Sequence, residues 1–167
     1  SFSLHFEAFL VEEGLFRLKS EDSMDCFYAD GLKFSCREGC TYCCGVEPGY
    51  VFLSQSDMDR LCAKTSLSQE QFIHRYCHTV NMGSFKLVSL LEQPNYDCIF
   101  LKEGRCSVYD ARPIQCRTYP FWPAIMDDAE SWKEEGQSCP GIGEGRHYSR
   151  EEIDELLSLQ RGREPLM

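Results

Sequence analysis

Four cysteines lie within nine positions near the start of the chain, and a second set follows later in the sequence. The first set is Cys36, Cys40, Cys43 and Cys44, and the second set is Cys98, Cys106, Cys116 and Cys139. Disulfides within the first set would close only very small loops. Thiolates, by contrast, are soft ligands that suit zinc or an iron–sulfur cluster. The sequence therefore predicts a metal-binding protein.

Eight thiolates are twice the number that one tetrahedral zinc ion takes. Two four-coordinate metals, or one cluster and one ion, would account for all of them. Cys43 and Cys44 are adjacent, so their side chains point in different directions. We expect them to bind two different metals, or to act as one ligand and one bridging sulfur. An alternative is that only four or five of the eight bind metal and the rest pack in the core.

The spacing of Cys36, Cys40 and Cys43 also matches the three-cysteine loop of radical-SAM enzymes, in which three thiolates hold a [4Fe–4S] cluster. Those enzymes use a repeated β/α barrel, and the sequence after Cys44 shows no such alternation. This excludes the barrel fold. It leaves open an iron–sulfur cluster held by these three cysteines and a distant fourth one.

Arginines accompany the cysteines in both sets. Arg37, Arg105, Arg112 and Arg117 each lie next to a cysteine or between two of them. A four-thiolate zinc centre carries a net charge of about −2, which nearby guanidinium groups would offset while donating hydrogen bonds to sulfur. We expect Arg112 and Arg117 to serve a metal cofactor in this way, with Arg112 reaching the region of Cys116. Ordinary surface arginines, or arginines that bind an anionic substrate, are the alternatives.

Length and composition indicate one domain over residues 1–167, with a metal-binding core over 34–140. The net charge of −10 argues against a nucleic-acid partner, which would need clustered Lys and Arg. No apolar run approaches the roughly 20 residues that a membrane span needs, and no secretory segment opens the chain. Eleven cysteines cannot all pair internally, so we expect a reducing, cytoplasmic setting.

Patterning predicts an α+β fold of short helices and small hairpins. Ser54, Ser68 and Ser149 resemble helix N-caps. The expected helices cover the segment up to about residue 17 and residues 55–64, 69–80, 110–117 and 149–159. The expected strands cover 49–53, 85–91, 98–101 and 106–109, and 118–123 is expected to be extended.

If residues 36–44 are helical, all four thiols of the first set share one face about 100° wide. Cys62 and Cys77 fall on the apolar faces of their expected helices, where a cysteine is normally a small core residue. His74, Cys77 and His78 have helical spacing that could bind a metal, but we expect Cys77 to face the core. The glycine-rich phosphate loop, the GxSxG motif and the HExxH motif are absent from the sequence. No motif therefore assigns an enzymatic activity, and the metal site leaves open whether the chain is an enzyme.

The two cysteine blocks resemble a known family. Cys36-x3-Cys40-x2-Cys43-Cys44 is followed by Asp97-Cys98-Ile99-Phe100-Leu101, by Gly104-Arg105-Cys106-Ser107-Val108-Tyr109 and by the segment from Arg112 to Phe121. Together these motifs, over about residues 34–140, are similar to the CxxxCxxCC cysteine-cluster proteins (YkgJ-type), which are described as zinc- or iron-chelating domains. The resemblance implies that the eight motif cysteines form the metal site and leaves Cys26, Cys62 and Cys77 outside it. A similar cluster in flagellin lysine N-methylases implies a link to methyl transfer.

We therefore expect a single α+β domain that holds zinc, in more than one ion, through these eight cysteines, with a structural or metal-handling role. Zinc is favoured because all-thiolate shells suit it and because the histidines lie outside the motifs. The alternative is an iron–sulfur protein with redox or methyltransferase-related activity. A third reading is an interaction adaptor whose zinc is purely structural, with a protein partner still to be identified.

Overall fold

Six helices and three two-stranded antiparallel sheets make up the part of the chain that the computed structural model describes, residues 26–45 and 48–167. This confirms the expected α+β class. The expected helix before residue 17 lies outside the described residues. The helices are α1 (Tyr42–Gly45), α2 (Gln55–Thr65), α3 (Gln69–Tyr76), α4 (Ile114–Thr118), α5 (Ala129–Ser138) and α6 (Arg150–Arg161). The strand pairs are β1 (Leu32–Phe34) with β6 (Arg146–Tyr148), β2 (Cys77–Asn81) with β3 (Lys86–Leu90), and β4 (Leu101–Lys102) with β5 (Arg105–Cys106).

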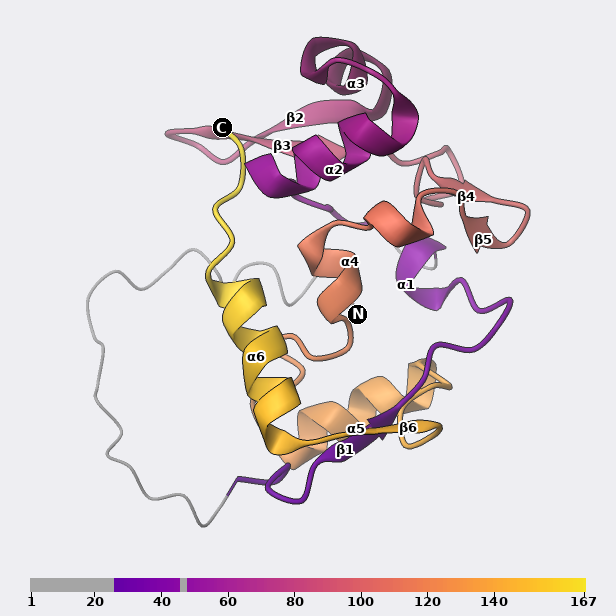
Figure 1. Cartoon of the computed structure of the whole chain (residues 1–167), viewed down its shortest axis with the longest axis vertical. Coiled ribbons are helices and arrows are strands. Elements are labelled where there is room, and N and C mark those ends of the chain that lie inside the picture. The colour runs from indigo at the N-terminus through magenta and orange to yellow at the C-terminus, as the bar shows by residue number, and fades with distance from the viewer. Residues whose placement is uncertain (1–25, 46–47) are drawn as a thin grey trace.

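One hydrophobic core lies between α2, α3 and the β2–β3 hairpin, in the upper half of Figure 1. Helix α2 begins at Ser54, whose side chain accepts from the Asp57 amide, and buries Met58 and Leu61 on one face. The C-terminal segment closes this core, because the Leu166 amide donates to the Leu53 carbonyl at 2.7 Å. We call this set of buried residues the upper core.

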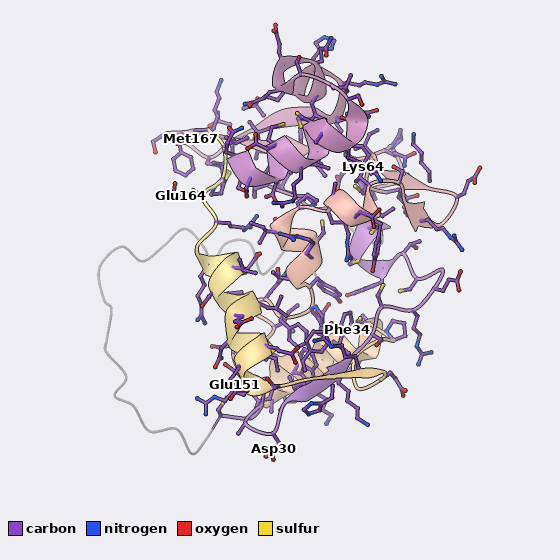
Figure 2. All side chains as sticks on the ribbon, viewed as in Figure 1. Asp30, Phe34, Lys64, Glu151, Glu164 and Met167 are labelled. Atoms are coloured by element: carbon purple, nitrogen blue, oxygen red, sulfur yellow. The ribbon has the colours of Figure 1, made fainter. Side chains whose placement is uncertain are left out.

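A second core, the lower core, lies between β1, β6, α5 and α6 in the lower half of Figure 1. Phe121 and Trp132 stack there at 5.6 Å between ring centroids, and Ile153 of α6 is fully buried. Figure 2 shows Phe34 in this half of the molecule and Met167 in the other half. The chain thus buries its apolar side chains in two separate clusters.

Helix α4 lies between the two cores, in the centre of Figure 1. Above it, the amide of Ile114 donates to the Asp57 carboxylate of α2 at 2.8 Å. Below it, the Thr118 hydroxyl donates to Gln160 of α6 at 3.1 Å. This short helix therefore connects α2 with α6.

Several expected elements form where the sequence placed them. Helix α2, helix α6 and strand β3 match their predicted positions, and the turn between β4 and β5 gives the expected hairpin in shorter form. Helix α3 ends at Tyr76 rather than at residue 80, because the chain continues as β2 and pairs with β3.

Other expectations were wrong. Residues 49–53 form no strand and contribute only an isolated bridge between Phe52 and Ser89. The expected helix over 110–117 is broken at Arg112, because the residue before a proline avoids helical dihedrals, and a 3₁₀ turn (Tyr109–Ala111) precedes α4. Residues 119–126 form turns rather than an extended segment. Helix α5 and strand β6 were not anticipated.

Candidate metal centre

The eight motif cysteines come from several separate segments. Cys36 and Cys40 lie in the loop after β1, Cys43 and Cys44 in α1, Cys98 before β4, Cys106 in β5, Cys116 in α4, and Cys139 at the end of α5. Cys98 and Cys106 pack against the upper core, while Cys139 belongs to the lower core and Cys43 packs against it. The cysteines therefore lie along the boundary between the two cores.

Backbone contacts hold these segments together. The Cys98 amide donates to the Cys44 carbonyl at 2.7 Å, which fixes α1 against the start of the β4–β5 hairpin. The Ser35 amide donates to the Gly141 carbonyl at 3.2 Å, which holds the residue before Cys36 beside the Cys139 turn. A Cβ atom at position 141 would lie only 2.3 Å from the Ser35 carbonyl oxygen, so this close approach requires glycine.

The first cysteine set is not one helix, which corrects the expectation of a single helical face. Only Tyr42–Gly45 is helical, and Cys36 to Thr41 form a loop in which the Cys40 amide donates to the Arg37 carbonyl at 3.1 Å. Gly39 has a φ of +77°, a left-handed conformation that ends any helix at this point. The loop leaves Cys36 exposed, whereas Cys40, Cys43 and Cys44 are half-buried.

A cavity of about 390 Å³ lies beside this loop. Five of the eight cysteines line it, together with four arginines and several aromatic side chains, and no Asp or Glu is among the lining residues. The cysteines are Cys36, Cys40, Cys43, Cys116 and Cys139, and the arginines are Arg37, Arg112, Arg117 and Arg146. The cavity is large enough for a small molecule or a metal cluster.

The adjacent thiols of Cys43 and Cys44 lie 3.8 Å apart and interact directly. The pKa of Cys44 is lowered to about 7 because the hydrogen bond between the two thiols and then the Arg112 guanidinium outweigh the opposing effect of burial. The same hydrogen bond, with burial, raises the pKa of Cys43. In this pair the Cys43 thiol therefore donates a hydrogen bond to the Cys44 thiolate. The thiolate is the form of cysteine that binds a metal.

Burial raises the pKa of three thiols of the second cysteine set, those of Cys98, Cys106 and Cys116. The pKa of Cys98 rises to about 12, and that of Cys116 rises well above its usual value because of burial and then the neighbouring thiol of Cys98. The pKa of Cys106 is also raised, by burial and by the neighbouring thiol of Cys44. A cation bound among such thiols would offset the repulsion between their charged forms and displace their protons.

Within residues 26–45 and 48–167, no three His, Cys, Asp or Glu side chains already form an arrangement that could hold a metal ion. The donor set nevertheless fits zinc or iron, because these residues supply eight thiols from two cores to one region. An ion would have to draw the thiols closer together. His74, Cys77 and His78 do not form the helical metal site that their spacing allowed, since α3 ends at Tyr76 and His78 lies beside the Tyr50 ring, while Cys77 faces the core as expected.

The two arginines expected beside the metal differ in their surroundings. The Arg112 guanidinium lies 3.7 Å from the centroid of the Tyr109 ring, and its Nε donates to the Tyr109 carbonyl at 3.1 Å. From there its charge helps to lower the pKa of Cys44 and opposes the burial that raises the pKa of Cys36, Cys106 and Cys116. Arg117 also lines the cavity, but the charges nearest to it belong to Arg60, Asp57 and Arg112.

Two further residues near the site were missed by the sequence analysis. Asp57 is fully buried and accepts from Ser54 and from the first amide of α4, the helix that carries Cys116. Arg163 follows α6, donates to the Phe52 carbonyl at 3.0 Å, and has its pKa lowered by burial but raised by Asp57 and Cys116. Neither lies in a cysteine motif, and only their tertiary contacts reveal them.

Comparison with known families bears on these motifs directly. Residues 35–140 match the family model CxxCxxCC, whose description is "putative zinc- or iron-chelating domain". The chain belongs to the CxxCxxCC family. The match confirms the resemblance seen in the sequence, and the matched residues include all eight motif cysteines. No solved structure matches the chain, and no helix among the residues described is long and apolar enough to cross a membrane.

Proposed function

We propose that the chain binds zinc, in two ions, through the thiolates of its eight motif cysteines. The observation that carries the proposal is that four of these thiols, those of Cys36, Cys44, Cys106 and Cys116, lie within electrostatic reach of Arg112. The family description supports metal chelation in general. Zinc is our choice because closed all-thiolate shells suit it and it needs no redox partner.

The proposed role is structural or metal-handling. Ions bound at the boundary between the cores would join α1, the β4–β5 hairpin, α4 and the end of α5, so binding energy would become folding energy. We propose a reducing, cytoplasmic setting, in which free thiols persist. The expected partners are metal ions rather than nucleic acid, since the chain carries a net charge of −10. A membrane is not expected, since no apolar run approaches the roughly 20 residues of a span.

A second candidate function is favoured by the cavity. Its volume of about 390 Å³ greatly exceeds the roughly 30 Å³ that a single water molecule occupies in the liquid. An iron–sulfur cluster would use more of this space than one zinc ion. Cys36, Cys40 and Cys43 all line the cavity, so they could hold such a cluster for a redox or methyltransferase-related reaction.

Anaerobic purification followed by elemental analysis distinguishes these candidates. We expect a colourless protein with two zinc ions per chain, and a lower zinc content in Cys40→Ser and Cys116→Ser. Cys62→Ala and Cys77→Ala are matched controls, because these cysteines pack in or against the upper core, and they should keep the full zinc content. Equal zinc loss in all four variants would contradict the proposed ligands. A brown protein with iron, bleached by dithionite, would favour the second candidate.

A further inference from the structure

The eight thiols fall into two groups of four that occupy different places. Cys44, Cys98, Cys106 and Cys116 form one group, which we call the inner set. Cys36, Cys40, Cys43 and Cys139 form the other, which we call the outer set. The division passes between the adjacent residues Cys43 and Cys44.

Contacts of the backbone and of the upper core gather the inner set. The Cys98 amide donates to the Cys44 carbonyl, and the Leu101 amide donates to the Cys98 carbonyl at 2.8 Å, while Leu101 pairs with Cys106 across the β4–β5 hairpin. Helix α4 brings Cys116 to this group, where it interacts electrostatically with the other three thiols. Each inner thiol also lies within electrostatic reach of the others, since Cys44 acts on both Cys98 and Cys106.

The outer set lies on the wall of the large cavity. All four of its cysteines line that cavity, and Cys43 and Cys139 pack in the lower core. The bond from the Ser35 amide to the Gly141 carbonyl keeps Cys36 near Cys139, and Cys36 interacts electrostatically with Cys40 and Cys139 more strongly than with Cys44 of the inner set. Of the inner set only Cys116 reaches the cavity, from the side of α4.

The surroundings of the two sets differ in access. Cys36 is the one exposed cysteine among those that the structure describes, and it begins a loop whose Arg37, Glu38 and Gly39 are all exposed. An incoming ligand can therefore approach the outer set through the cavity or by displacing this loop. Beside the inner set lies only a smaller pocket of about 40 Å³, which Cys44 and Cys98 line, so replacement of all four inner ligands would require the hairpin, α1 and α4 to separate. Opening an exposed loop costs less free energy than separating packed elements.

We propose that the inner set holds a structural ion and that the outer set holds an exchangeable ion, which can be passed to or taken from another thiol ligand. This division of roles rests on the proposed zinc function. Exchange of the outer ion would proceed by stepwise replacement of Cys36 and Cys40 by the incoming thiolates. The zinc ion keeps its charge throughout, and no redox step is involved.

Zinc release from the loaded protein tests the division. A chromophoric chelator such as 4-(2-pyridylazo)resorcinol should remove one zinc per chain in a fast phase and the second about tenfold more slowly or slower still. N-ethylmaleimide is added after the fast phase, and the labelled cysteines are identified by peptide mass spectrometry. We expect label on Cys36, Cys40 and Cys43, with Cys44 and the rest of the inner set protected. The adjacent pair makes this a sharp comparison, because fragmentation spectra separate a label on Cys43 from one on Cys44.

The outcomes separate this inference from the proposed function. Two zinc ions released in one phase, or label on Cys98 or Cys106 together with Cys36, would overturn the division and leave zinc binding intact. A protein that takes up no zinc, or only one ion, would overturn both. Cys36→Ser serves as a second test, since it should abolish the fast phase and keep the slow one. Loss of the slow phase in that variant would contradict the division.

Discussion

The buried carboxylate of Asp57 should control the metal centre through α4, although it contacts no cysteine. One oxygen accepts from the Ser54 amide and hydroxyl at 3.0 and 2.8 Å, and the other accepts from Arg60 and from the Ile114 amide. Asp57→Asn replaces one of these oxygens with an NH₂ group of the same size. At the oxygen that accepts from Arg60 and from the Ile114 amide, this NH₂ group would face two donors, and the Asp57 site is fully buried.

The structure gives the size of the effect. Each buried donor left without an acceptor costs about 1–3 kcal/mol, so two of them should lower the free energy of unfolding by roughly 3 kcal/mol. Because α4 begins at Ile114 and carries Cys116, we also expect weaker zinc binding, by about tenfold or more. Urea unfolding of the metal-free protein measures the first effect, and chelator competition on the folded protein measures the second.

Gln71→Ala is the matched control for this prediction. Gln71 completes the same kind of capping box at the start of α3, accepting from the Ser68 amide at 3.0 Å, but it has no bond to α4. We expect a loss of about 1 kcal/mol and unchanged zinc affinity. If Asp57→Asn binds zinc as tightly as the wild type, the argument that Asp57 positions Cys116 is refuted.

Three further predictions follow from the site. Chelation under reducing conditions should lower the melting temperature by roughly 8–16 °C, since about 4 kcal/mol of ligand stabilisation corresponds to 2–4 °C per kcal/mol; an unchanged melt after verified metal loss would contradict it. Arg112→Gln should weaken zinc affinity by about 10–100-fold at unchanged stoichiometry, whereas exposed Arg161→Gln should not; chelator competition that finds Arg112→Gln within twofold of wild type would exclude this role. In the metal-free protein, burial raises the pKa of Cys98 to about 12 from 9.0. The folded state thus holds this proton more tightly than the unfolded state. The free energy of unfolding should therefore be highest below about pH 9 and should fall towards pH 12, by up to about 4 kcal/mol for this residue. Urea unfolding at successive pH values measures this fall, and a free energy of unfolding that does not change over the range would contradict the prediction.

Local signals account for the parts of the fold that the sequence predicted. The helices that begin after Ser54, Ser68 and Ser149 were found because a capping box occupies only four consecutive residues. Strand β6 pairs with β1 across more than a hundred residues, with Phe34 opposite Arg146, and no local pattern records that contact. Helix α5 was missed because Trp132 is its only buried residue, so it shows little apolar periodicity.

In the candidate site, too, local sequence signals predicted some features and long-range contacts determine the others. Cysteine spacing indicated all eight candidate ligands, because the motifs keep their members close in sequence. The shape of the first set was wrong, since its helical face ignored the left-handed conformation of Gly39. Asp57 accepts from α4 and Arg163 donates to Phe52, each more than fifty positions away in the sequence, and only the folded chain brings these residues together.

The zinc-edge X-ray absorption spectrum of the anaerobically purified protein tests the central claim most directly. Our account predicts that every zinc ion has four sulfur neighbours at about 2.3 Å and no nitrogen or oxygen neighbour, because only cysteines are proposed as ligands. Nitrogen or oxygen atoms in the first shell, or a protein that carries no zinc, would contradict it.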